Sequence, residues 1–90
     1  MSVYEHVGPN RVRTPSGSEL ELVGRAGLVL YRDGERLEVD SEMLDPPMTI
    51  AVYVRSVPSF AAVPARSVLD EIVAALKWMG FTVELIGALA

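Results

Sequence analysis

The residues spaced closely enough to do chemistry are the carboxylates Glu38, Asp40, Glu42 and Asp45. Paired carboxylates act as general acid and base only when burial or mutual repulsion separates their pKa values. Alternation along the chain places Glu38 and Asp40 on an outward face, and the ligand pattern of a calcium loop is absent. We therefore interpret these acids as a solvated edge and predict neither a metal nor a cofactor.

No other residues form a catalytic pattern. His6 is the only histidine, and no Gly-x-Ser-x-Gly nucleophile elbow is present. Gly24, Gly27 and Gly34 are not followed by the Lys-Ser/Thr pair of a phosphate-binding loop. We predict no catalytic residue, and a small enzyme is the least favoured functional class.

Tyrosine and arginine side chains recur in the middle of the chain, and these residue types are enriched at the centres of protein interfaces. The alternative is ordinary cross-strand pairing, for example of Tyr31 with Arg36. Trp78 lies about 180° from Leu69 around its helix, so it is either covered by another segment, such as the loop at Phe60, or exposed to a partner. The residues that we predict to contact a partner are Tyr31, Arg36, Glu38, Asp40, Glu42, Tyr53, Arg55 and Trp78.

These residues must be positioned by a β-hairpin and the strand that follows it. Two runs that contain apolar residues flank Asp33-Gly34, the strongest short hairpin signal. A two-residue loop places Tyr31 opposite Arg36, and alternation then gives one apolar face and one mostly polar face. The side chains that share the apolar face are Leu28, Leu30, Leu37 and Val39.

The rest of the chain supplies further strands and one long helix. Ser41 is expected to cap a helical turn that ends at Leu44, before Pro46-Pro47. The helix begins at Arg66 or Ser67, with Ser67 and Asp70 as a capping box, and ends at Met79, before Gly80. The expected strands are residues 11–14, 19–22, 28–32, 35–40, 48–56 and 81–86, and residues 1–10 form a loose arm or a first edge strand.

The order of elements predicts an α+β fold with a single domain, residues 1–90. It is an antiparallel β-meander followed by a strand–helix–strand unit, with one long helix packed on the sheet. Ninety residues, half of them hydrophobic, are enough for one modest core.

Charge and composition narrow the classes of partner and the compartment. The acidic net charge of −4 resides entirely in Tyr31 to Asp45, which disfavours nucleic acid and suits a basic protein. There is no cysteine, no signal-peptide core in Met1 to Arg13, and no run long enough to cross a membrane. We expect a cytoplasmic protein with no membrane partner, and the oligomeric state, monomer or dimer, is open.

Several short motifs occur in an order that resembles one bacterial family. They are Leu30-Tyr31, Gly34-Glu35-Arg36, Val39-Asp40-Ser41-Glu42, Ile50-Ala51-Val52-Tyr53, Ser56-Val57 and Met79-Gly80-Phe81-Thr82-Val83-Glu84-Leu85. This order resembles the immunity protein 74 family, over about Leu28 to Ile86.

The resemblance implies a role in polymorphic toxin or contact-dependent inhibition systems. Such a protein binds one cognate toxin domain, often a nuclease, blocks it inside the producing cell and does no chemistry itself. An acidic patch would suit a basic toxin of this kind. The alternative from another class is a structural or assembly module that self-associates through an edge strand or through Trp78.

Overall fold

A single curved sheet with one helix across it makes up the fold, as seen in a computed structural model that describes residues 3–44, 48–59 and 63–89. Seven strands follow one another in chain order, and all neighbours are antiparallel except β6 and β7. The predicted α+β class is confirmed. The elements are β1 (Glu5–Gly8), β2 (Arg11–Arg13), β3 (Glu19–Leu22), β4 (Ala26–Arg32), β5 (Glu35–Leu44), β6 (Thr49–Tyr53), the 3-10 helix η1 (Val54–Ser56), α1 (Ala65–Trp78) and β7 (Thr82–Ile86).

The hairpin of β4 and β5 has the predicted register. Tyr31 lies opposite Arg36 and Leu30 opposite Leu37. Both turn residues, Asp33 and Gly34, have positive φ, as a two-residue hairpin loop of type I′ requires. The apolar face of the hairpin is buried beneath α1, whereas Arg36 is exposed on the outer face, the side of the sheet away from α1. The division of faces that alternation predicts is therefore confirmed.

An irregularity near the end of the hairpin overturns the helical turn expected from Ser41. The register shifts there, because the single residue Gly27 of β4 lies opposite Asp40 and Ser41 of β5. This is a β-bulge, which bends the strand. Ser41 is buried and accepts a hydrogen bond from the Gly27 N–H at 3.1 Å, so it caps no helix and β5 continues to Leu44. Pro46-Pro47 lie outside the described residues.

Two further boundaries differ from the prediction. The strand expected over residues 48–56 ends at Tyr53, where the chain enters η1. The helix α1 begins at Ala65, directly after Pro64, whose carbonyl accepts hydrogen bonds from the Ser67 and Val68 N–H groups. Ser67 therefore lies inside the helix, and the expected capping box is not formed. The predicted end at Gly80 is confirmed by its φ of +99°.

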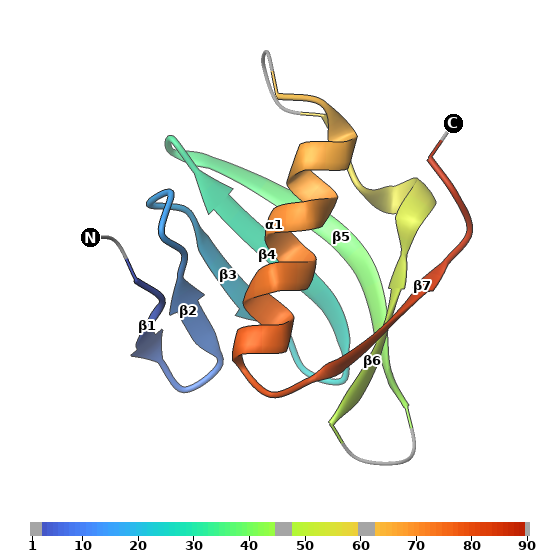
Figure 1. Cartoon of the computed structure of the whole chain (residues 1–90), viewed down its shortest axis with the longest axis horizontal. Coiled ribbons are helices and arrows are strands. Elements are labelled where there is room, and N and C mark those ends of the chain that lie inside the picture. Colours follow the sequence, from blue (N-terminus) through green and yellow to red (C-terminus); the bar gives the residue numbers. More distant parts are fainter. Residues whose placement is uncertain (1–2, 45–47, 60–62, 90) are drawn as a thin grey trace.

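The helix covers the sheet between its two edges, as Figure 1 shows, with β1 and β2 on one side and β7 on the other. The chain passes from β6 through α1 to the parallel strand β7, which confirms the strand–helix–strand unit. Among the described residues, no helix has both the length and the apolar character needed to cross a membrane. The core side chains are Val12, Leu20, Leu22, Leu28, Leu30, Val39, Ile50, Val52, Val54, Val57, Val68, Leu69, Ile72, Ala75 and Leu76.

One polar contact fixes α1 relative to the strands beneath it. The Glu71 carboxylate accepts a hydrogen bond from the Ser16 hydroxyl at 2.6 Å and lies 3.4 Å from Nη1 of Arg32. Ser16 belongs to the turn between β2 and β3, and Arg32 ends β4. Because the side chains of Glu71 and Arg32 are largely shielded from solvent, this contact orients the helix across three strands.

Candidate protein-binding surface

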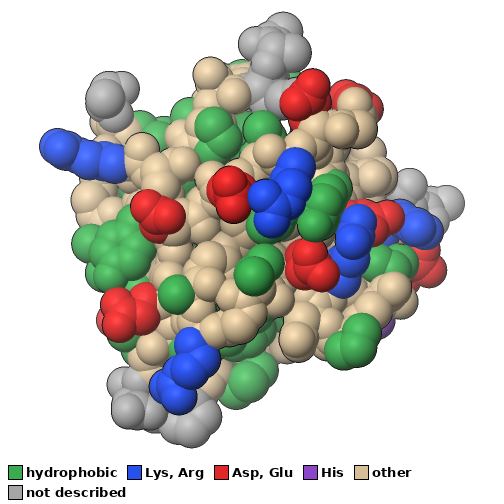
Figure 2. Space-filling model, turned by 180° about the vertical axis from the view of Figure 1, so that it is seen from behind, with side chains coloured by type: hydrophobic (Ala, Val, Ile, Leu, Met, Phe, Trp, Pro, Cys, Tyr) green, Lys and Arg blue, Asp and Glu red, His purple; other side chains and the backbone are tan. Residues whose placement is uncertain are grey.

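The outer face of the sheet brings six of the eight predicted contact residues together. Figure 2 shows this face, and on its right-hand side basic and acidic side chains alternate in a band. The rest of the face has a different charge pattern, so the face divides into two parts. The six residues on the outer face are Tyr31, Arg36, Glu38, Asp40, Glu42 and Tyr53.

The first part is a ladder of mutually neutralised side chains, which we name the paired ladder. Nε of Arg11 lies 2.6 Å from Glu19, and Nη2 of Arg13 lies 3.4 Å from the same carboxylate. Arg36 pairs with Glu38 at 3.2 Å. Its members come from β2, β3, β4 and β5, and they are Arg11, Arg13, Glu19, Glu21, Tyr31, Arg36 and Glu38.

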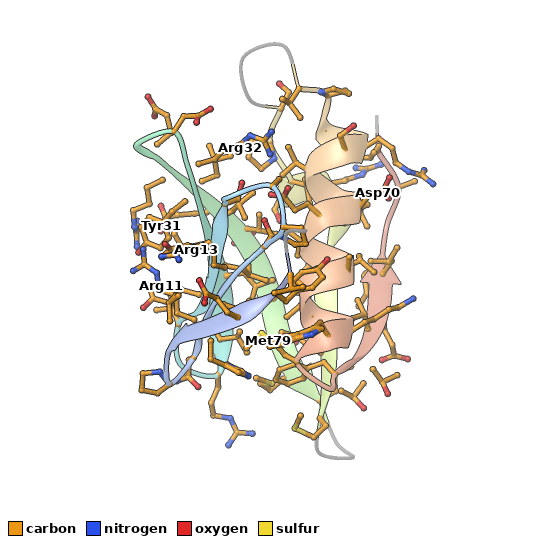
Figure 3. All side chains as sticks on the ribbon, turned by 60° about the vertical axis from the view of Figure 1, so that its left-hand side comes forward. Arg11, Arg13, Tyr31, Arg32, Asp70 and Met79 are labelled. Carbon is orange, nitrogen blue, oxygen red and sulfur yellow. The ribbon has the colours of Figure 1, made fainter. Side chains whose placement is uncertain are left out.

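Tyr31 is held at the centre of the paired ladder. The Arg11 guanidinium lies 4.1 Å above its ring, and its hydroxyl donates a hydrogen bond to Glu21 at 2.9 Å. Figure 3 shows Tyr31, Arg11 and Arg13 on the side of the sheet away from α1. A hydrogen bond with Tyr31 and the charge of Glu38 raise the pKa of Arg36 above its usual value. The alternative of ordinary cross-strand pairing thus describes Tyr31 and Arg36 well.

The second part is an acidic surface formed by Asp40, Glu42 and Glu84 around Tyr53. Glu42 and Glu84 lie on either side of Ala51 in the register of β5, β6 and β7. Strands are spaced about 4.8 Å apart, so the Cα atoms of Glu42 and Glu84 lie roughly 10 Å apart across the sheet. Among the described residues, no ion pair joins any of these three acids to a basic side chain.

Tyr53 is bound into the acidic surface by its hydroxyl, which donates a hydrogen bond to Oε2 of Glu42 at 2.9 Å. This hydrogen bond, followed by the charge of Glu42, burial and the charge of Asp40, raises the pKa of Tyr53 above its ordinary value. The phenol therefore keeps its proton at neutral pH. A flat ring with a fixed hydroxyl therefore lies beside the carboxylate of Glu42.

The backbone beneath the acidic surface is also tied down. The Asp40 N–H donates to the Ser56 hydroxyl at 2.8 Å, and that hydroxyl donates to the Tyr53 carbonyl at 2.6 Å. Ser56 thus links β5 to η1 at the point where β6 ends. The carboxylates on these segments are presented from a fixed frame, which lowers the entropy lost when a partner binds.

A small hollow of about 150 Å³ adjoins the acidic surface at the β-bulge. Val29, on the outer face but only 2% exposed, and the more exposed Val23 contribute its apolar lining. Arg36, Glu38 and Asp40 are the charged residues that line it. An aliphatic chain that ends in a cation has the right chemistry for this hollow, because its stem meets valine and its charge meets Asp40.

Arg55 does not lie on the outer face beside Tyr53, contrary to our expectation. The strand ends at Tyr53, and the turn of η1 carries Arg55 toward Gly87 and toward the hollow beside the first turn of α1. Its Cγ lies 3.8 Å from the position that a Cβ on Gly87 would occupy. Arg55 is therefore separated from the acidic surface by the change of backbone direction.

Trp78 lies on the opposite side of the molecule from the acidic surface, at the end of α1. Tyr4 stacks on it with ring centroids 5.5 Å apart, and the His6 ring lies 4.9 Å away. Trp78 remains 43% exposed. It is covered in part by the N-terminal segment, and Phe60, the covering residue suggested by the sequence, lies outside the described residues.

Glu84 is the member of the acidic surface that sequence reasoning missed. Alternation in the last strand does place Glu84 opposite in face to Val83 and Leu85. The missing information was strand order: only the parallel pairing of β7 with β6 brings Glu84 beside Ala51.

Within the described ranges, no three His, Asp or Glu side chains are grouped so as to hold a metal ion.

Comparison of the chain with protein-family models, with curated proteins and with solved structures found no match.

Proposed function

We propose that this chain is an immunity protein: it binds a cognate bacterial toxin domain, a basic one such as a nuclease, and occludes it without catalysis. The observation that carries the proposal is the acidic surface of Asp40, Glu42 and Glu84, three carboxylates without a basic partner among the described residues. The order of motifs that resembles the immunity protein 74 family supports the same proposal. A cytoplasmic location and a bacterial origin are part of this proposal.

Electrostatics explains why such a surface suits a nuclease inhibitor. A nuclease must present clustered Lys and Arg to bind phosphates, and the same cluster attracts carboxylates. Complementary charge accelerates encounter and orients the two proteins before contact. Binding there covers the nucleic-acid site directly, so inhibition needs no chemistry from the immunity protein.

The hollow at the β-bulge would add specificity to this attraction. Its valine lining and its flanking Asp40 fit one lysine or arginine side chain of the toxin. Tyr53 supplies a rigid aromatic contact near it, with its hydroxyl held by Glu42. The paired ladder plays a smaller part in this proposal, because its charges are already neutralised within the sheet.

The test is a titration of this chain with the toxin domain encoded immediately upstream, in which isothermal calorimetry measures the binding. The variant Asp40→Lys with Glu42→Lys reverses two charges of the acidic surface. The matched control, Glu35→Lys with Asp70→Lys, changes net charge equally at exposed positions on the hairpin tip and on α1. We expect the first pair to weaken binding by roughly 30- to 100-fold, about 2–3 kcal/mol, and the control by less than about threefold.

Absence of binding at micromolar protein would end the proposal of toxin inhibition. Equal losses in the two double variants would retain binding but remove the acidic surface as its site. Circular dichroism of each variant ensures that a loss of binding reflects charge and not unfolding.

A further inference from the structure

The outer edge of β7 is regular, and no strand of the described residues pairs with it. β7 is the last strand of the sheet, and its strand partner is β6, in register from Thr82 to Ile86. The Thr82 N–H bonds to the Met48 carbonyl beside β6 at 2.7 Å. Because the N–H and C=O of a residue point to the same side and successive residues alternate, Val83 and Leu85 direct theirs away from β6. The edge therefore offers two residues' backbone groups to another strand.

The side chains along this edge lack the usual protection against pairing. Leu85 is 51% exposed and Ile86 is 45% exposed. Natural edges carry lysine, proline or a bulge that discourages another strand. β7 has none of these in Thr82–Ile86, and Glu84 is its only charged residue.

The opposite edge of the sheet is protected. Strand β1 has an irregular register between His6 and Gly8 and is followed by Pro9. Glu5 lies on it and pairs with Arg13. The contrast indicates that an open edge is a property of β7 and not of the sheet as a whole.

We propose that a second copy of this chain occupies the β7 edge, in a symmetric dimer with antiparallel β7 strands. The two-fold axis passes at Leu85, so that each Leu85 N–H donates to the Leu85 carbonyl of the other copy. Two sheets then join into one continuous sheet. A two-fold contact of this kind closes at two subunits, whereas pairing of β7 with β1 would grow into a filament.

The register of this dimer follows from charge and exposure. An axis at Glu84 would set two glutamates directly opposite each other, at the closest separation of an antiparallel pair. An axis at Leu85 instead places Glu84 opposite Ile86 and buries Leu85 against its copy. It also uses the outward backbone groups of Val83 and Leu85, which an axis at Leu85 brings into the new ladder.

Salt dependence is a consequence of the same geometry. Glu84 lies on the acidic surface, so the dimer brings two acidic surfaces close together on the outer face. Their mutual repulsion is screened by added salt. Dimer formation should therefore strengthen as ionic strength rises, opposite to the expected behaviour of a complex with a basic partner. The dimer does not depend on the proposed function.

A single introduced cysteine tests the register, because the natural chain has none. In the dimer, Leu85→Cys places two cysteines about 5.5 Å apart between Cα atoms, within the range of a disulfide. Ile86→Cys, at a position of similar exposure, places them about 8 Å apart, beyond that range. Val23→Cys, also similarly exposed, reports random collisions. We expect rapid oxidation to a covalent dimer with Leu85→Cys and at least tenfold slower oxidation with the other two variants.

Sedimentation of the unmodified chain over a wide concentration range gives the second measurement. We expect a monomer–dimer equilibrium that Leu85→Lys shifts to monomer and that Val7→Lys, on the β1 edge, leaves unchanged. A monomer at every concentration would overturn the proposal, as would equal oxidation rates for the three cysteine variants. Filaments, or a dimer lost with Val7→Lys, would overturn the proposal in favour of pairing through β1. Protection of the β7 amides from exchange only on toxin addition would also overturn it, because it would assign this edge to the toxin.

Discussion

Side chains of the same type have different structural roles in this protein. Glu42 binds the Tyr53 hydroxyl on the outer face, whereas Glu71 binds Ser16 and Arg32 beneath α1. Both are glutamates in partly polar settings, yet one prepares a surface and the other orients a helix. Residue types alone predict neither role, because the partners of each glutamate lie on other elements of the fold. Each contact makes its own measurable prediction.

The Tyr53 contact predicts a titration. The pKa of Tyr53 lies above its ordinary value, chiefly because of the hydrogen bond to Glu42, so the contact is intact at neutral pH and is lost as pH rises through that pKa. Glu42→Ala should lower this pKa toward the usual value of about 10. Ultraviolet absorbance of the phenolate measures it. Glu84→Ala, across Ala51 from Glu42, should leave the pKa nearly unchanged, and an equal decrease would contradict the assignment.

The Glu71 contact predicts a difference in stability between neighbouring helix residues. Glu71→Ala removes a shielded carboxylate that serves two groups, and we expect the free energy of unfolding to fall by about 1–2 kcal/mol. Asp70→Ala removes an exposed pair with Arg66 and should cost less than about 0.5 kcal/mol. Urea unfolding compares the two. A loss from Asp70→Ala as large as that from Glu71→Ala would contradict this view of the helix.

Elements were predicted well where their signals are local. The Asp33-Gly34 turn fixes the hairpin register, and alternation then fixes its two faces. The prediction was wrong at two serines. Ser41 accepts a hydrogen bond from the distant Gly27 across the bulge, whereas the start of α1 moved by a local choice, with Pro64 in place of Ser67 as the residue before the helix. In the first case the serine hydroxyl bonds to the backbone of a neighbouring strand and not to a helix end. In the second case the serine lies inside the helix and not at its start.

The N-terminal strand gives the prediction at this scale. Tyr4 and His6 connect β1 to Trp78, and stacking of this kind contributes about 0.5–1.5 kcal/mol. Tyr4→Ala should therefore increase amide exchange in β1 by roughly 3- to 10-fold while exchange in β4 and β5 is unchanged. Val3→Ala, at an exposed neighbour, is the control. Faster exchange throughout the sheet would show that the stack supports the whole fold and not one strand.

At the scale of the whole molecule, sequence reasoning found the outer face but not its division. Strand order is a non-local property, so the sequence could not show that β7 returns beside β6 and adds Glu84 to the acidic surface. It also could not show that Arg11 and Glu21 surround Tyr31. Charge counted along the chain located the acidic segment, and the fold decided which of its acids have cationic neighbours.

The most direct test of toxin binding at the acidic surface is a nuclear magnetic resonance titration of the labelled chain with the upstream toxin domain. We predict that amide shifts concentrate at Asp40, Glu42, Ala51, Tyr53 and Glu84, and that they diminish at high salt. Shifts centred on Trp78 and α1, or binding that leaves the acidic surface unperturbed, would contradict the proposal that this surface binds the toxin.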